Sequence, residues 1–519
     1  MGGGLISIFF TAISALAAFM TAPRGGAFCL FRIVAVWVLV AAIGFLIGNK
    51  WLVFTLIGVT LLIVAPARPA ERVYLYIGAM AAIPIGLSLN LPFPGLNYLV
   101  TLDYAKMTTV ILLGPAFLKY VFSRPPQKLK IVGRLLIIFV LLTGIMSIRD
   151  LPFTSMLRAL FDQFVLVIIP YLTISRSLTN QNEIDNAIKA LFVSAIILAG
   201  IGIFSTLWSW NYYAHLSDRI VGKSFTDYRN GFLRIGATTG STLLGFVMGA
   251  AIVSAFVLQA AKEHSKIFAI AQACVFGFVL FTTGARGGWL AAVLIIGAYF
   301  LLSKLQKSGR QLLLVSLISG VVIMMVLVFQ DSAVLNDAYG SIDYRADLLR
   351  TSMGQIAERP LFGSADFLES PRFAHLRQGE GIIDLVNVYI QLSLYYGLVG
   401  FSLFIGANLL ALHGGLTTLD RFPSGRDVSV DVVSARRTVA LLIAMHISYL
   451  AMIATISWVS YIWHYGFVIL GLMVAQVRVG ALPSVITPER RDETPLNQPP
   501  NTPKPHASLP YGARFVRRP

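Results

Sequence analysis

Apolar runs of about 15 to 22 residues recur from one end of the chain to the other, and this pattern limits its fold more than any other feature. A helix of this length crosses the hydrocarbon core of a bilayer. The composition agrees, because 56% of the 519 residues are hydrophobic and 13% are charged. The sequence predicts an all-α, polytopic bundle of membrane spans. It excludes a soluble enzyme, a secreted disulfide scaffold and a nucleic-acid-binding protein.

Charged residues, Pro and Asn divide the runs into about 13 to 15 predicted spans. The stretch 34–65 leaves two interpretations open: two short helices broken at Asn49 and Lys50, or one long helix with a re-entrant piece. The first run, 5–22, lacks the basic start and the cleavage site of a removable signal peptide, so we expect a retained first span. The expected centres lie near Ser14, Leu39, Gly58, Met80, Leu113, Phe139, Leu166, Ile196, Ala250, Val275, Val293, Ile318, Leu403, Met445 and Ile469.

A long polar segment, 331–384, a shorter one, roughly 209–239, and a polar tail interrupt this pattern. The tail holds nine of the 23 prolines and shows no apolar periodicity, which is typical of a disordered segment. Recruitment of a cytoplasmic partner and a linker role both remain open for it. We divide the chain into N-terminal spans (1–208), spans with a short outer loop and Arg286 (209–330), a large outer loop (331–384), C-terminal spans (385–477) and the Pro-rich tail (478–519).

The positive charge of the chain lies on one side of the predicted spans. When charges are assigned to alternate loops, one set holds 27 basic and 10 acidic residues and the other holds 14 of each. The first set therefore carries the whole net charge of +17. Because Lys and Arg are enriched in cytoplasmic loops, we expect this set and the tail to be cytoplasmic and both polar segments to face outward. The side on which the N-terminus lies stays open.

The outer segment 331–384 is the first candidate for a functional site. It contains five Arg, no Lys, one His and nine carboxylates. The guanidinium group of Arg presents parallel donors that suit phosphate or carboxylate; alternatively, these arginines pair with the local acids and order the loop. His375 is a candidate general base, and a merely solvated histidine is the alternative. The arginines are Arg345, Arg350, Arg359, Arg372 and Arg377.

A second candidate is Arg286, which lies between two apolar runs in the sequence Thr-Gly-Ala-Arg-Gly-Gly at 283–288. A charge at membrane depth is costly and usually faces a polar cavity or a ligand; contact with lipid headgroups is the alternative. Arg234 closes the shorter outer segment in a similar way. A third candidate is the pair Asn387 and Gln391, one helical turn apart, whose amides suit a sugar or a neighbouring helix.

The cysteines indicate neither a metal site nor a disulfide framework. Cys29 and Cys274 are the only two, and they lie far apart in the sequence. The outer segments also lack an evident cluster of His and Asp. We therefore expect no metal and no cofactor.

Together these stretches resemble the superfamily of O-antigen ligases and O-antigen polymerases, which are bacterial membrane glycosyltransferases. The resemblance runs from about residue 234 to residue 400. It rests on the element at 283–288, which is similar to the family's Ser-Arg-Gly-Ala type element, on Tyr344-Arg345 followed by Glu-Arg-Pro-Leu-Phe-Gly at 358–363, on the long outward loop, and on Asn387 followed by Gly397 and Gly400.

The resemblance implies glycan transfer at the outer face of the bacterial inner membrane. The donor would be an oligosaccharide linked to undecaprenyl pyrophosphate, and the acceptor would be another glycan. Arg286 and Arg345 would bind the pyrophosphate, and no metal or nucleotide would be required. Arg234, Asn387 and Gln391 are the further candidates for substrate binding. Membrane lipids surround such a protein, and chain-length regulators or export proteins are further candidate partners.

One residue departs from the family pattern. The ligases carry His directly before the Asn of the last motif, where this chain has Val386. Because valine cannot transfer a proton, either His375, Glu380 or Asp384 deprotonates the acceptor hydroxyl, or this branch does not need the histidine. The difference favours a polymerase of repeat units, for exopolysaccharide, capsule or O-antigen.

Two alternatives to the polymerase remain. A ligase would transfer a finished glycan to lipid A core. A flippase would carry the lipid-linked oligosaccharide across the membrane. Transport pathways usually expose several ionisable residues within the spans, whereas the polarity of this chain is concentrated in one outer loop.

Overall fold

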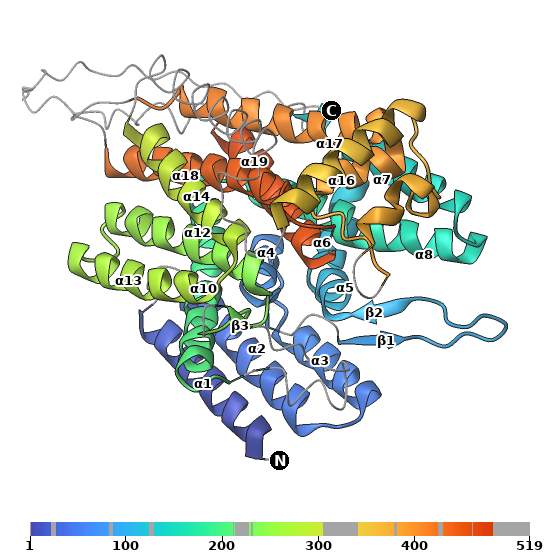
Figure 1. Cartoon of the computed structure of the whole chain (residues 1–519). Coiled ribbons are helices and arrows are strands. Elements are labelled where there is room, and N and C mark those ends of the chain that lie inside the picture. Colours follow the sequence, from blue (N-terminus) through green and yellow to red (C-terminus); the bar gives the residue numbers. More distant parts are fainter. Residues whose placement is uncertain are drawn as a thin grey trace, which may run out of the picture.

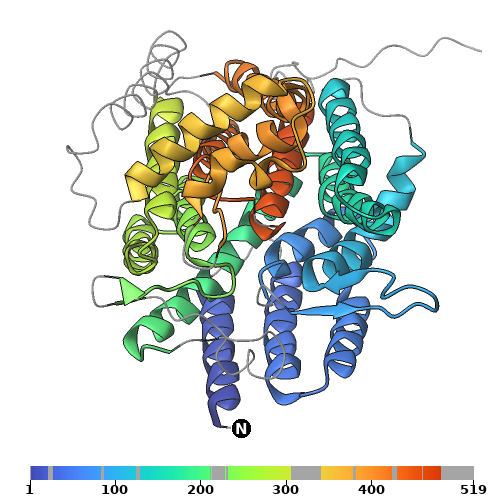
Figure 2. The same cartoon turned by 45° about the vertical axis from the view of Figure 1, so that its right-hand side comes forward.

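The computed structural model shows a bundle of α-helices, with two short two-stranded β-sheets in the described part of the chain (Figures 1 and 2). The all-α, polytopic fold class predicted from the sequence is confirmed. The predicted span near Ile318 and the tail beyond residue 480 lie outside the described residues. The structure describes residues 2–21, 27–82, 87–123, 129–210, 212, 228–229, 232–304, 341–377, 381–423, 429–458 and 460–480.

Polar side chains mark the starts of several helices in the N-terminal half. Asn49 accepts hydrogen bonds from the N–H groups of Trp51 and Leu52 and begins α3 (Lys50–Val64). The stretch 34–65 therefore forms two helices, the first of the two interpretations. The other elements are α1 (Gly2–Thr21), α2 (Ala27–Leu46), α4 (Pro69–Ala79), β1 (Ser88–Asn90), β2 (Thr101–Asp103), α5 (Tyr104–Thr108), the π-helix η1 (Thr109–Leu113), α6 (Gly114–Val121), α7 (Lys130–Met146), η2 (Ser147–Arg149), α8 (Phe153–Gln163), the π-helix η3 (Phe164–Ile168), α9 (Ile169–Ser177) and α10 (Gln181–Leu207).

In the C-terminal half, polar side chains again mark the starts of helices. Ser265 accepts a hydrogen bond from the N–H of Phe268 and begins α13 (Lys266–Thr282). The long helix α17 (Val388–Leu419) is kinked at Gly397, whose backbone is not helical. The other elements are β3 (Tyr228–Arg229), β4 (Phe232–Leu233), α12 (Ser241–Ala260), α14 (Arg286–Lys304), α16 (Ser341–Glu358), the 3-10 helices η6 (Phe367–Glu369) and η7 (Pro371–Leu376), α18 (Val430–Ile453) and α19 (Ser460–Val479).

Eight helical segments of the described residues are long and apolar enough to cross a membrane, and three shorter apolar helices accompany them. The 24 residues of α18 also suffice in length, although Asp431, Arg436 and Arg437 lie in its first turns. The predicted span near Met80 corresponds to α4, whose 11 residues are too few for a full crossing. The chain is a multi-pass membrane protein.

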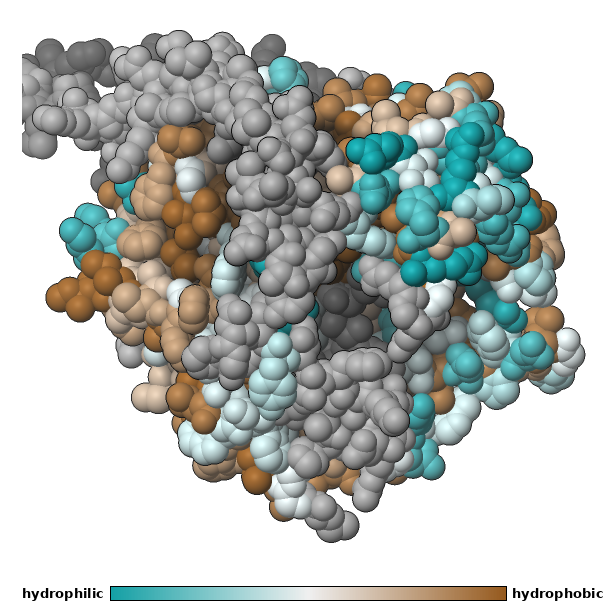
Figure 3. Space-filling model, viewed as in Figure 1, coloured by the Kyte–Doolittle hydropathy of each residue, from teal (hydrophilic) through white to brown (hydrophobic). Residues whose placement is uncertain are grey.

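The helix α1 shows how the bundle sorts its side chains. Its small and polar residues, among them Gly4, Ser7 and Thr11, are buried, whereas Phe9 and Met20 are exposed. Small residues let membrane helices approach each other, and lipid covers the large apolar side chains. Figure 3 shows hydrophobic residues on the left, over the region of α13 and α14, and hydrophilic residues over α16 at the upper right.

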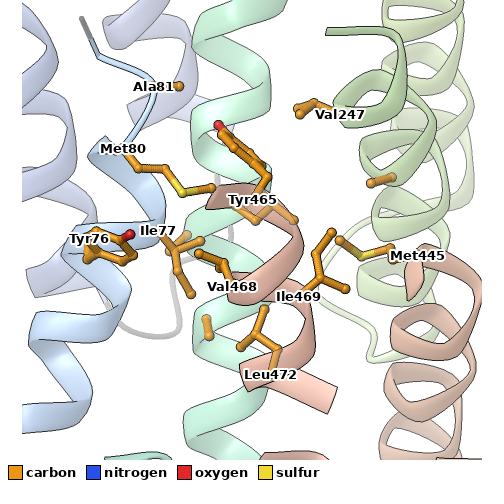
Figure 4. Close-up of a cluster of buried hydrophobic side chains, with 14 of the residues drawn as sticks. Tyr76, Ile77, Met80, Ala81, Val247, Met445, Tyr465, Val468, Ile469 and Leu472 are labelled. Atoms are coloured by element: carbon orange, nitrogen blue, oxygen red, sulfur yellow. The ribbon is translucent and has the colours of Figure 1, made fainter. Parts of the chain in front are cut away.

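The last described helix, α19, lies in the interior of the bundle. Its Tyr465 and Ile469 are buried with Ile77 of α4, Val247 of α12 and Met445 of α18 in one core cluster (Figure 4). A helix that packs on both halves of the chain holds them together. The start of α19, and the loop that precedes it, are therefore positioned by the core.

At each end of the bundle, segments that were assigned to the same side of the membrane contact each other, as the alternation of spans predicts. At one end, Lys189 of α10 and Glu263, which follows α12, form an ion pair of 2.7 Å, and both belong to the set of charges predicted to be cytoplasmic. At the other end, Arg149 donates a hydrogen bond of 2.9 Å to the carbonyl oxygen of Phe362, and both belong to loops predicted to face outward. We call this second end the outer end. That it faces away from the cytoplasm remains a prediction from the charges.

Candidate functional site

Two parallel helices bring their N-termini together at the outer end. A Cβ added to Gly245 of α12 would meet the Cα of Gly288 in α14 at 2.8 Å. One turn further, a Cβ added to Gly249 would meet the Cα of Ala292 at 2.6 Å. The spacing of four residues keeps small residues on the seam of both helices, so their backbones touch. Because both contacts advance in the same direction, the first turns of α12 and α14 lie side by side.

Arg286 is the first residue of α14, and its side chain is exposed. A helix N-terminus carries a partial positive charge, so a cation is unfavourable there unless an anion joins it. The neighbouring helix α12 begins at Ser241, after Gly240 with a φ of 79°, and no described side chain caps it. Unpaired N–H groups at helix N-termini bind phosphate and other anions. The arrangement therefore suits an anion between Arg286 and the two helix ends.

Some arginines of the chain cap the C-terminal end of a helix, but this role does not explain the position of Arg286. Arg149 donates to the carbonyl oxygen of Met146 at the end of α7, at 3.1 Å. Arg436 donates to the carbonyl oxygen of Ser303 near the end of α14, also at 3.1 Å. Cations are favourable at these C-terminal ends, where the carbonyl groups lack helical partners. Arg286 lies at the opposite end of its helix.

Arg234 lies on a segment that is joined to the same turn. The N–H of the next residue, Ile235, donates to the carbonyl oxygen of Thr282 at 3.3 Å. Thr282 ends α13, four residues before Arg286. The side chain of Arg234 is half-buried. The structure thus connects the segments that carry Arg234 and Arg286, as the candidate site requires.

A loop that the sequence did not single out contacts the other candidates. It comprises residues 454–458 and we call it the α18–α19 loop. Its Thr455 lies against the first turn of α14, because a Cβ added to Gly287 would meet its Oγ1 at 2.6 Å. The carbonyl oxygen of Thr455 accepts a hydrogen bond of 3.4 Å from Arg345 of α16. The turn that begins with Arg286 and the side chain of Arg345 therefore meet at one residue.

Asp384 contacts the same loop two residues further on. The hydroxyl of Ser457 donates a hydrogen bond to the carboxylate of Asp384. The hydroxyl of Tyr344 accepts from the N–H of Asp384 and donates to its carbonyl oxygen, each at 3.0 Å. Asp384 remains exposed. It is therefore a fixed carboxylate that a second molecule can reach.

Asn387 and Gln391 have partners within the protein. The side-chain oxygen of Asn387 accepts from the N–H groups of Tyr389 at 2.9 Å and Ile390 at 3.2 Å, and so caps α17. The side-chain oxygen of Gln391 accepts from the N–H of Trp458 at 2.8 Å. Both oxygens position the backbone around the site. The sugar contacts predicted for these residues stay a prediction.

The other arginines of the outer segment bind its acids or its backbone, as the alternative interpretation expects. A hydrogen bond from Ser364 lowers the pKa of the exposed Asp366, and Arg359 adds a smaller effect. Among the five arginines, and within the described residues, Arg345 is the one with a hydrogen bond to the α18–α19 loop. The other contacts are Arg350–Asp347 at 3.0 Å, Arg359–Asp366 at 3.5 Å, Arg372–Glu358 at 2.6 Å and Arg377 to the carbonyl oxygen of Leu368 at 3.3 Å.

The three candidate bases differ in their positions. His375 lies exposed on η7, between Phe373 and Leu376, which belong to a small apolar core of the outer segment. Across the described ranges, no hydrogen bond joins His375 to the α18–α19 loop. Glu380 lies outside the described residues. Of the two described candidates, Asp384 is the one that the fold brings to the loop.

The stretch 358–363 ends in a turn, residues 360–363, that fits into the kink of α17. Gly397 has a φ of 64°, and a Cβ there would collide with a carbonyl oxygen of this turn. The N–H of Leu398 donates to the carbonyl oxygen of the first turn residue at 2.7 Å, and Arg149 donates to that of the third at 2.9 Å. The turn thus fixes the direction of the outer part of α17, which carries Gln391.

The α18–α19 loop was missed because it contains no charged residue. The assignment of charges to alternate loops does not reveal a loop without charges. Ile456 and Trp458 are apolar, like the runs on either side of the loop. The polar residues Thr455 and Ser457, at a predicted outward turn, are the signal that points to it. Their spacing of two residues is short, so the signal is weak.

These features define a membrane protein in which two adjoining helix N-termini, two arginines and a carboxylate lie at one end of the bundle. Residues 271–405 match the family model described as O-antigen ligase. The match confirms the resemblance to O-antigen ligases and polymerases, and it indicates a glycan-processing, glycosyltransferase-like enzyme. It includes Arg286, Arg345 and Asp384, but neither Arg234 nor the α18–α19 loop. No curated protein matches the chain.

Proposed function

We propose that the protein joins oligosaccharide repeat units carried on undecaprenyl pyrophosphate, at the outer face of the inner membrane. The observation that best supports this is Arg286 at the adjoining N-termini of α12 and α14. A lipid-linked donor presents a pyrophosphate at the membrane surface. Helix N–H groups and a guanidinium group together bind such an anion. Arg345 and Arg234 lie on the neighbouring segments and extend the positive charge.

In the proposed reaction, the acceptor hydroxyl attacks the anomeric carbon of the donor. The new glycosidic bond forms as the bond to the lipid pyrophosphate breaks, and the lipid pyrophosphate leaves with the electron pair. Arg286 and Arg345 stabilise the charge that develops on this leaving group. Asp384 accepts the proton of the hydroxyl. No metal takes part in this scheme, and metal independence stays a prediction.

Val386 supports a polymerase over a ligase. Its side chain packs against the small apolar core of the outer segment, at the position where ligases carry the histidine of their motif. Its N–H donates to the carboxylate of Asp384 at 3.4 Å, which adds to the contacts that hold this group. A carboxylate two residues before the missing histidine can accept the proton instead. The ligase remains the second candidate, because the matching family model is described by that activity.

Mass analysis of the lipid-linked glycans in a deletion strain tests the proposal. A polymerase deletion should leave single repeat units on the lipid carrier at the outer face, and the polymer should disappear. Finished chains that accumulate on the carrier would instead identify a ligase. Single repeat units that accumulate at the inner face would identify a flippase and would overturn the proposal.

Replacing Asp384 with Asn tests the proton acceptor. We expect polymer synthesis to fall roughly 100- to 10,000-fold while the protein stays in the membrane, because the amide keeps a hydrogen-bond acceptor for Ser457 but cannot take a proton. The rate should be measured with lipid-linked substrate across a range of pH. His375→Ala and Glu380→Gln are the comparison variants. Wild-type rates in Asp384→Asn, with a loss in one of these, would move the role to that residue.

A further inference from the structure

A ladder of aromatic rings leads from the bundle core to the α18–α19 loop. Phe404 and Trp463 are buried and stacked, with ring centroids 4.9 Å apart and planes at 22°. Trp463 is followed by Trp458 at 4.1 Å and 30°, and Tyr396 lies 6.2 Å from Trp458. Trp458 is half-exposed. It is therefore the outer, accessible end of a rigid stack.

Trp458 is also fixed next to the candidate catalytic groups. Its N–H donates to Gln391 at 2.8 Å, which holds the backbone of the loop. The preceding residue, Ser457, donates to the carboxylate of Asp384. Three residues before Trp458, the loop accepts a hydrogen bond from Arg345. The indole ring thus lies on the same short loop that contacts an arginine and the carboxylate.

The chemistry of the substrate needs such a group. A sugar ring has faces made of C–H groups, which arginines and carboxylates cannot bind. The face of an indole ring carries negative charge density and attracts these C–H groups. A ring that packs on Trp463, on a backbone that Gln391 holds, loses little freedom when a ligand binds. The ladder therefore supplies a preorganised apolar surface beside the groups that would act on the sugar.

We propose that Trp458 is a binding residue for the sugar portion of the lipid-linked glycan, on which one pyranose ring stacks. This inference rests on the proposed function and adds a residue that recognises carbohydrate rather than pyrophosphate. Trp residues also anchor membrane proteins at the lipid interface. A membrane anchor would contribute equally to the binding of every lipid ligand, whereas a sugar-binding residue would contribute only to the binding of a lipid that carries a glycan. A comparison of the two kinds of ligand therefore separates these roles.

The test compares two probes on the purified full-length protein in lipid nanodiscs. One probe is undecaprenyl pyrophosphate, and the other is the glycan-bearing lipid extracted from the deletion strain. The wild-type protein should bind the glycan-bearing lipid more tightly. In Trp458→Leu, which keeps apolar bulk and loses the ring, this preference should fall about tenfold, while the Kd for undecaprenyl pyrophosphate stays unchanged. Trp458→Phe keeps an aromatic face and should retain most of the preference.

Trp208→Leu is the matched control. Trp208 is 60% exposed at the end of α10 and packs on Phe204, with centroids 5.0 Å apart. Its replacement should change neither Kd. The inference is overturned if the wild type shows no preference, or if Trp458→Leu weakens both probes equally or neither. Arg286→Ala should weaken both probes. If Arg286→Ala leaves the Kd for undecaprenyl pyrophosphate unchanged, the proposed pyrophosphate site is wrong. The role of Trp458 in sugar binding is decided separately, by the Trp458 variants.

Discussion

Replacing Arg286 with Ala is expected to abolish polymer formation while the protein remains in the membrane. The side chain is exposed, so its loss leaves no cavity in the core. It also removes a cation from a helix N-terminus, which relieves an unfavourable interaction in the empty protein. In the reaction, however, one lost donor to a developing negative charge costs roughly 100- to 1,000-fold in rate. The polymer ladder and the amount of protein in the membrane fraction are the two measurements.

Arg345→Ala should reduce synthesis in the same way, and Arg350→Ala is the matched control. Arg345 and Arg350 lie on one helix and are both exposed, but Arg350 pairs with Asp347 at 3.0 Å. An exposed pair of this kind contributes at most about 1 kcal/mol, so its loss should leave synthesis close to wild type. Full-length polymer from the Arg286 and Arg345 variants, at normal protein levels, would contradict the proposed pyrophosphate site.

Replacing Gly397 with Ala is expected to have the largest effect on stability. A residue with a side chain is strained at a φ of 64°, and its Cβ would collide with a carbonyl oxygen of the turn 360–363. Strain and overpacking together cost roughly 3 kcal/mol or more. The turn should separate from α17 and release the outer segment. Thermal unfolding of the purified protein and limited proteolysis of the outer segment measure this loss.

Gly277→Ala is the control for that substitution. Gly277 lies in α13, and a Cβ added there would meet no described atom within 4 Å. Alanine favours a helix over glycine by up to about 1 kcal/mol, so this variant should be as stable as the wild type or slightly more. If Gly397→Ala unfolds at the same temperature as Gly277→Ala, the turn does not depend on the kink.

The spans were predictable because a helix in a bilayer needs a run of apolar residues, which is visible in the order of residues along the chain. The break at Asn49 was also within reach, since a side chain that caps a helix is local information. The kink at Gly397 was not. It depends on a turn more than thirty residues earlier in the sequence, and the residues next to Gly397 carry no information about that contact.

The candidate site was predicted in part. Arg286 became a candidate because a charge between two apolar runs stands out, whereas Arg345 and Asp384 became candidates through the family resemblance and the departure from it at Val386. Without the resemblance, residue type alone does not separate Arg345 from Arg359, since that difference depends on which partner each reaches: the carbonyl oxygen of Thr455 for the first, Asp366 for the second. The α18–α19 loop needed tertiary structure.

The length of α17 has a consequence for where the chemistry takes place. The helix has 32 residues, more than the roughly 20 that a bilayer requires. The part beyond the kink, 398–419, covers roughly 33 Å at 1.5 Å per residue, close to the thickness of the hydrocarbon core. The kink then marks the depth at which hydrocarbon gives way to headgroups. In the proposed reaction, Gln391 and the loop it contacts would then lie just above that level, at the depth of the phosphates of a lipid carrier. The length of α17 would thereby set the depth of the reaction in the membrane.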